Sequence, residues 1–140
     1  MAGLTITLDL DPPAADREAI IAGLRSYNRS HAIAPGWSPM TLLLRDEAGT
    51  VQGGLIGESG WDWLHIQFLW VAEALQGQGH GRALLTRAEV EARTRGCRGV
   101  HLDSHQFQAP AFYQRLGYQV FGVLEDYPAG SRRFFLSKAL

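Results

Sequence analysis

The chain has 140 residues, a length that fits a single domain and leaves no room for a second one. Its 13 Lys and Arg balance 14 Asp and Glu, so the sequence does not indicate a general nucleic-acid binder or a membrane-surface protein. Cys97 is the only cysteine, which excludes an internal disulfide and a cysteine-rich zinc site. No basic leader precedes an apolar stretch, and no apolar run approaches the roughly 20 residues that span a bilayer. We therefore expect a soluble, cytoplasmic protein whose partners are small molecules rather than nucleic acid or a membrane.

The first half of the chain predicts a strand, a helix and three antiparallel strands. Residues 4–10 alternate as a half-buried strand does. A helix is expected next, with Asp11 as N-cap and Pro12 at its first position. The next two strands form a hairpin, and a long β-forming run supplies the third. These three strands are expected at residues 40–45, at residues 51–57 and in the run WDWLHIQFLWV after Gly60.

The second half of the chain alternates helical and strand patterns. The expected elements are a helix at 80–95 ended by Gly96, a strand at 100–105, a short helix at 111–116, and two strands at 118–124 and 132–137. Because a strand, a crossover helix and another strand follow one another, at least one parallel pair lies in the sheet. We predict one α/β domain over residues 1–140, with a mixed, mostly antiparallel sheet flanked by helices.

A glycine-rich segment, QGQGHGRALL, follows the third strand and opens the long helix. Arg82 and Ala83 stand where a Walker loop needs Lys and Ser or Thr, and Arg82 also occupies the last glycine position of a dinucleotide fingerprint. The remaining pattern, Q-x-x-G-x-G, directs backbone N–H groups and a helix N-terminus at one point that suits a pyrophosphate. The alternative is an ordinary turn that uses glycine for tight geometry.

Together with its flanks this segment resembles a known family. LWVAEALQGQGHGRALL is similar to the coenzyme-binding segment of the GNAT acetyltransferase superfamily, and APAFYQRLGY is similar to its second hallmark, A-x-x-x-Y-x-x-x-G-(Phe/Tyr). The resemblance covers about residues 40–140. It implies the GNAT fold, with about six to seven strands, and acetyl-CoA as co-substrate for acetylation of an amine.

The resemblance also implies which residues hold the coenzyme. One group lies along the pantetheine arm, with a backbone N–H facing the thioester carbonyl, and the other surrounds the phosphates. Gln106 stands near the position where the family often has an asparagine that contacts the pantetheine. The pantetheine group is Leu69, Trp70 and Val71, and the phosphate group is Gln76, Gly77, Gln78, Gly79, His80, Gly81 and Arg82.

Acetyl transfer by direct attack needs a neutral amine, a polarised carbonyl and a proton for the departing thiolate. The family resemblance gives the proton to Tyr113, whose alternative role is packing alone. Cys97 follows a helix C-terminus, where no dipole lowers the pKa of a thiol, so we do not expect it to be a nucleophile.

The sequence offers several candidates for the general base. His65 is the first candidate, on the expectation that it shares a strand face with Gln67, Leu69 and Val71, and its alternative role is a hydrogen-bonded histidine of the sheet. Glu58 and Asp103 are the next candidates. No metal is expected at the pattern H-x-D-x-H, because same-face neighbours on a strand lie roughly 6.5 to 7 Å apart. The members of this pattern are His101, Asp103 and His105.

For the acceptor, the tryptophans and nearby acids suggest a cationic or aromatic amine. The residues with this signal are Trp37, Trp61, Trp63, Glu58, Asp62, Glu125, Asp126 and Tyr127, of which Asp126 and Tyr127 lie on the loop before the last strand. We predict an N-acetyltransferase that modifies a primary amine of a small molecule. An acetyltransferase for protein amines and a non-catalytic, CoA-binding regulatory module stay open, and a homodimer is compatible with the sequence.

Overall fold

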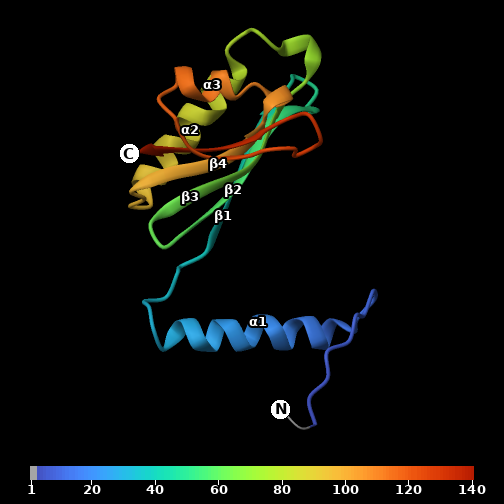
Figure 1. Cartoon of the computed structure of the whole chain (residues 1–140). Helices are drawn as coiled ribbons and strands as arrows, with labels where there is room; N and C mark the ends of the chain where they lie inside the picture. The colour runs from blue at the N-terminus through green and yellow to red at the C-terminus, as the bar shows by residue number, and fades with distance from the viewer. Residues whose placement is uncertain (1–2) are drawn as a thin grey trace. The chain divides into compact units, whose positions relative to one another are not determined.

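The computed structural model describes residues 3–140, and the chain divides into an N-terminal unit, residues 1–34, and a second unit, residues 35–140. Figure 1 shows the elements of both units, each of which is described by itself. The helix α1, Ala14–Arg29, is the only helix among the described residues of the N-terminal unit, and none of its side chains is buried. Among residues 3–140 no helix is long and apolar enough to cross a membrane.

Two expectations for the N-terminal unit were wrong. Residues 4–10 form no strand, because a strand needs a neighbour for its backbone hydrogen bonds and none of the described strands pairs with this segment. The helix α1 begins after Pro13, which is extended and forms no side-chain cap, instead of after Asp11.

The second unit contains a six-stranded sheet in the order β1-β2-β3-β4-β6-β5. The pair β3–β4 is parallel and the other four pairs are antiparallel, as the alternation of strands and helices in the sequence predicts. The α/β class and the mixed, mostly antiparallel sheet are therefore confirmed. The strands are β1 Ser38–Arg45, β2 Val51–Gly60, β3 Trp63–Val71, β4 Gly99–His105, β5 Gln119–Leu124 and β6 Arg133–Ala139.

One face of the sheet, here called the inner face, packs against two helices of the same unit. The helix α2, His80–Thr94, crosses β1 to β4, and the shorter α3, Pro110–Arg115, lies beside β5 (Figure 1). Alternate residues along each strand lie on the opposite, outer face. Fully buried side chains of the inner face include Leu55, Leu64, Val100 and Leu136, and Leu85 of α2 is buried against them.

Two irregularities of β3 position the functional site. The parallel pairing of β3 with β4 ends where His65 pairs with His101, and beyond this point a cavity separates the two strands. In the pairing with β2, Ile56 lies opposite Phe68 but Gly57 lies opposite Ile66, so Gln67 is an extra residue, a β-bulge. A bulge changes which side chains share a face of the strand.

Candidate active site

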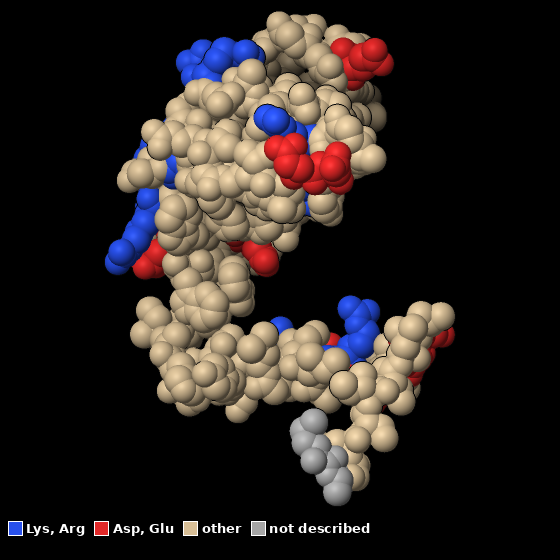
Figure 2. Space-filling model, in the orientation of Figure 1, with Lys and Arg blue, Asp and Glu red and all other residues tan. Residues whose placement is uncertain are grey.

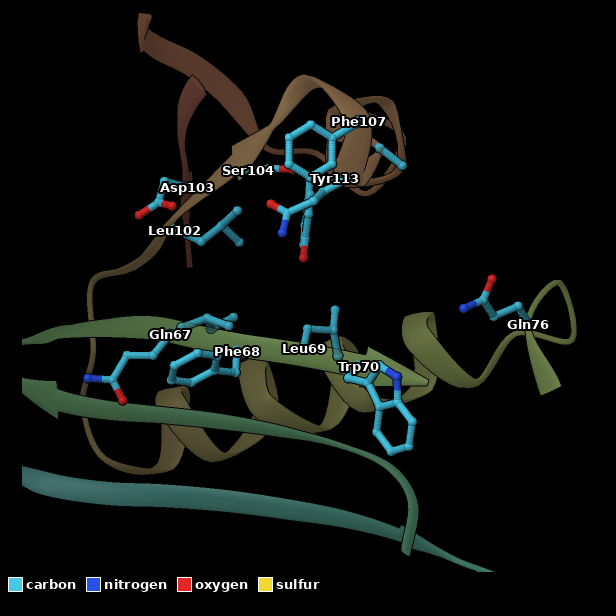
Figure 3. Close-up of a pocket in the computed structure, with 13 residues that line it drawn as sticks. Gln67, Phe68, Leu69, Trp70, Gln76, Leu102, Asp103, Ser104, Phe107 and Tyr113 are labelled. Carbon is cyan, nitrogen blue, oxygen red and sulfur yellow. The ribbon is translucent and has the colours of Figure 1, made fainter. Parts of the chain in front are cut away.

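A cavity of about 500 Å³ lies between β3 and β4 beyond their last paired residues. Figure 3 shows Leu69 of β3 and the hydroxyl group of Tyr113 pointing into this gap, while Phe68 and Trp70 lie on the other side of β3. Because β4 no longer pairs here, this edge of β3 can offer its backbone groups to a ligand. The lining residues from the two strands are Ile66, Gln67, Phe68, Leu69, Trp70, Leu102, Asp103 and Ser104.

A second cavity of about 460 Å³ continues from the first toward the glycine-rich loop. The two cavities share lining residues, so they form one groove, here called the cleft, from the space between the strands to the start of α2. The residues that line both are Leu69, Gln76, Gln108, Ala109 and Tyr113. Those that line only the loop end include Val71, Gly77, Gly79, His80, Gly81, Arg82, Phe112 and Arg115.

The backbone of the glycine-rich loop adopts left-handed conformations just before α2. Gly77 and Gly79 have φ angles of 75° and 87°, a left-handed conformation that favours glycine. Gly79 is the N-cap of α2, and because no side chain caps this helix, its first N–H groups stay available to a ligand. A Cβ at either glycine would meet no atom within 4 Å, so backbone conformation, rather than crowding, requires glycine here.

Two glutamines of this loop brace it. The Nε2 group of Gln76 donates to the carbonyl oxygen of Val71 at 3.0 Å, which ties the loop to the end of β3. Gln78 donates to the carbonyl oxygen of Ala74 at 3.3 Å and is absent from the lining of either cavity. Of the residues expected at the phosphates, Gln78 is therefore the one that lies outside the cleft.

Tyr113 lies on α3 at the junction of the two cavities. Its half-buried ring makes edge contacts with Phe112 and Tyr118, at centroid distances of 5.1 and 5.9 Å. Burial raises the pKa of the Tyr113 hydroxyl above its usual value, and the negative charge of Asp103 raises it further. The hydroxyl therefore stays protonated at neutral pH, and it points into the cleft (Figure 3).

His65, the first candidate for the general base, lies outside the cleft. The bulge at Gln67 separates it from the face of Leu69: His65 pairs with Glu58, and Leu69 pairs with the buried Leu55, three residues away on β2. The expectation that His65 shares a face with Leu69 and Val71 was thus wrong, because an alternation rule fails across an extra residue. Neither cavity of the cleft is lined by His65.

The outer-face position of His65 gives it a different partner. Its ring stacks on that of His101 with a centroid distance of 4.5 Å and an angle of 3° between the planes. Burial lowers the pKa of His101, and the neighbouring His65 lowers it further. The two imidazoles form a stacked pair at the point where β3 and β4 separate.

Gln106 and Gln108 differ in what they contact. The Oε1 atom of Gln106 accepts a hydrogen bond from the backbone N–H of Arg132 at 3.2 Å, so this side chain holds the loop before β6. Gln108 lines both cavities, and its Oε1 accepts from the backbone N–H of His105 at 2.9 Å. The run HQFQAP contains both amides, but its sequence alone does not distinguish them.

The remaining candidates are positioned as follows. Cys97 is buried, and burial raises the pKa of its thiol, as expected for an unreactive cysteine. His101, Asp103 and His105 share the outer face, and within residues 3–140 no three His, Cys, Asp or Glu side chains are grouped so that they could hold a metal. Asp126 accepts a hydrogen bond from Gly130 within its own turn.

The predicted tryptophan-lined pocket is not part of the cleft. Trp37 and Trp61 contact each other at 5.8 Å, and Trp63 lines a separate hollow of about 420 Å³ on the outer face. Residues that the sequence did not indicate as site residues, and that line the cleft, include Ser104, Phe107, Gln108, Phe112 and Arg115. Ser104, Phe107 and Gln108 come from the end of β4 and the turn after it, which carry no motif, whereas Phe112 and Arg115 lie within the motif APAFYQRLGY.

Comparison with known proteins gives consistent matches. The sequence profile described as "Acetyltransferase (GNAT) family" matches residues 14–118. The blasticidin-S acetyltransferase of Streptomyces morookaense is 44% identical over 95 residues, 67% of this chain and 70% of that protein. An acetyltransferase of Agrobacterium fabrum is 33% identical over 96% of both chains. The crystal structure of an acetyltransferase from Bacillus cereus superposes with a TM-score of 0.88 at 35% identity, over 96% of this chain and 98% of that one.

Proposed function

Because the chain belongs to the acetyltransferase (GNAT) family, we propose that it transfers the acetyl group of acetyl-CoA to a primary amine of a small molecule. The observation that carries this proposal is the continuous cleft from the glycine-rich loop to Tyr113. It joins an anion site to a proton donor across the unpaired edge of β3. The family match begins at residue 14, inside the N-terminal unit, so we assign residues 1–140 to one acetyltransferase domain.

The cleft fits the coenzyme in its chemistry. Backbone N–H groups at Gly79 and the start of α2 would hold the pyrophosphate, with Arg82 supplying positive charge. Leu69, Trp70 and Val71 would lie along the pantetheine arm, where the edge of β3 faces the gap. A strand edge without a partner pairs readily with the amides of an extended ligand. Acetyl-CoA would supply the thioester.

Acetyl transfer beside Tyr113 needs a proton donor for the departing thiolate and no covalent enzyme intermediate. Tyr113 keeps its proton at neutral pH because of its raised pKa, and it would donate this proton to the departing thiolate. His65 does not line the cleft, so any role as a base would require a chain of water molecules between its ring and the amine. Gln106 would act on the coenzyme only through the loop that it holds.

Two features support a small acceptor. A relative 44% identical over 95 residues is named for the acetylation of blasticidin S, a small molecule. On the face that Figure 2 shows, basic and acidic side chains lie in small separate groups among uncharged residues, a pattern that does not attract a polyanion.

The proposal is tested with the purified chain, acetyl-CoA and a panel of primary amines that includes aminoglycosides and short peptides. Released thiol is measured with a thiol reagent, and mass spectrometry identifies the acetylated product. We expect turnover with at least one small amine and a much lower rate with peptide N-termini. Faster acetylation of peptides would indicate an enzyme for protein amines, and coenzyme binding without turnover on any amine would indicate a regulatory module.

A further inference from the structure

The end of the cleft farthest from the glycine-rich loop, here called the outer mouth, is bordered by Gln67 and Asp103. Figure 3 shows Gln67 on β3 and Asp103 on β4 at one end of the cleft, with the Gln67 amide on the side of β3 where Phe68 and Trp70 lie, and Gln76 at the other end. Gln67 is the extra residue of the bulge, and bulges often re-aim a side chain next to an active site. Asp103 lies on the outer face, because its neighbours Leu102 and Ser104 are buried on the inner face.

Asp103 forms an ion pair that uses one of its two carboxylate oxygens. The Nε and Nη2 atoms of Arg133 lie 2.9 and 2.6 Å from the same oxygen, Oδ1. Neither of these two contacts involves the second oxygen, Oδ2. The two side chains are only 27% and 24% exposed, so the carboxylate is fixed in place yet still reaches the cleft that it lines.

Aromatic rings hold the arginine in position. Its guanidinium lies 4.7 Å from the ring centre of Tyr127 and 5.6 Å from that of Phe135, within the range of cation–π attraction. Tyr127 is fixed in turn by His105, whose Nδ1 lies 2.9 Å from the Tyr127 carbonyl oxygen. The loop before β6 therefore supports the orientation of Asp103, although its own Asp126 is used within a turn.

The pairing with Arg133 suits the chemistry of an amine nucleophile. An isolated carboxylate would favour the ammonium form of a bound amine, which cannot attack a thioester. When an arginine compensates the charge of the carboxylate, the free oxygen still accepts a hydrogen bond from a neutral N–H. Asp103 can thus orient an amine without strongly holding it in the protonated form.

We propose that the outer mouth is the acceptor subsite, in which Oδ2 of Asp103 binds the neutral primary amine of a small-molecule acceptor and the side-chain amide of Gln67 contacts the rest of that molecule. Arg133 is a positioning residue, which acts by orienting Asp103. This inference rests on the proposed function and adds to it the residues that recognise the acceptor. It also explains why Tyr113 and Asp103 line one cavity, since the amine and the thiolate leaving group meet there.

The test is Asp103→Asn, assayed with the best acceptor found for the wild-type chain. We expect kcat/KM for the acceptor to fall about 10- to 100-fold, the effect of a lost hydrogen bond to a charged group, and the Kd for acetyl-CoA to change less than twofold. Gln67→Ala should lower kcat/KM for the acceptor by a smaller factor. The matched control is Glu91→Gln, which breaks the ion pair with Arg95 on α2, at 3.1 Å and outside the cleft, and should leave both constants unchanged.

Each outcome decides the inference. Unchanged acceptor kinetics in Asp103→Asn would overturn it, and so would equal losses for acceptor and coenzyme. If Asp103→Asn does not fold, Gln67→Ala decides, because the Gln67 side chain is exposed and its removal does not disturb the core. Failure of the proposed function is seen separately, as absence of turnover in the wild-type chain.

Discussion

The two ends of the cleft differ in composition: backbone groups form the coenzyme end, and side chains form the outer mouth. At the coenzyme end the ligand would meet backbone groups from one short segment, Val71 to Arg82, whose conformation depends on glycines with positive φ. At the outer mouth it would meet side chains from β3 and β4, fixed by a residue of β6. A site made of local backbone leaves a motif in the sequence, whereas a site made of side chains from distant strands does not. The acceptor end can therefore change its specificity without disturbing the coenzyme end.

The largest expected effect comes from Tyr113, which lies between the two ends. Tyr113→Phe keeps the ring and removes the only proton that the side chain can give, so kcat should fall about 10²- to 10⁴-fold while the Kd for acetyl-CoA barely changes. Steady-state kinetics and calorimetry measure the two quantities.

The neighbouring Tyr118 provides the control. It is buried, and its hydroxyl lies 3.4 Å from Glu89 rather than in the cleft. Tyr118→Phe should reduce stability and leave kcat within about threefold of wild type, since a structural hydrogen bond contributes to folding and not to proton transfer. Equal activity of the Tyr113 and Tyr118 variants would mean that another group protonates the thiolate.

A smaller effect is expected at the coenzyme end. In Gly79→Val a β-branched residue must adopt a φ near 87°, which strains the loop by about 1 to 3 kcal/mol and moves the N–H groups from the anion. We expect the Kd for acetyl-CoA, measured by calorimetry, to rise at least about tenfold.

Gly96→Val is the matched control for this change. Gly96 follows the other end of α2, has a φ of 79°, and a Cβ there would also meet no atom within 4 Å. The two variants should lose similar stability in thermal unfolding, but only the change at Gly79 should weaken coenzyme binding. Weakened binding in both variants would show that α2 as a whole, and not the loop, determines affinity.

The same contrast explains how far the sequence predicted the structure. The strands and helices from β1 to β6 follow from apolar alternation, turn glycines and the helical face of Leu84, Leu85, Ala88 and Ala92, all of which are local signals. The parallel pair follows from element order. Residues 4–10 were predicted as a strand because alternation indicates a suitable segment but not whether a neighbouring strand is present.

The acceptor end shows why the rest could not be predicted. The extra residue Gln67 shifts the faces of β3, and nothing in the run LHIQFLWV marks which residue will be extra. The pairing of Asp103 with Arg133 joins β4 to β6, and the sequence alone does not specify that register. The alternation rule that points to His65 holds only for an uninterrupted strand.

The smallest expected effect is an electrostatic one, by which the charge of Asp103 at the outer mouth acts on the pKa of Tyr113. Burial is the main cause of the raised pKa of Tyr113, and the charge of Asp103 is the second. Asp103→Asn removes the second cause, so the pKa of Tyr113 should fall but stay above its usual value. The alkaline limb of the kcat profile should then move to lower pH, because the tyrosine loses its proton sooner.

Protein stability gives a second measurement of the same shift. A tyrosine whose pKa is higher in the folded than in the unfolded chain stabilises the fold below the unfolded pKa, and this stabilisation is lost as the pH rises above it. In Asp103→Asn the pKa of Tyr113 should differ less between the folded and the unfolded chain. This variant should therefore lose less stability than wild type between neutral and strongly alkaline pH, as measured by urea unfolding. Glu91→Gln removes a carboxylate from an ion pair outside the cleft and should change neither profile. If the alkaline limb of Asp103→Asn coincides with that of wild type, the charge of Asp103 does not reach the proton donor, and the outer mouth acts independently of Tyr113.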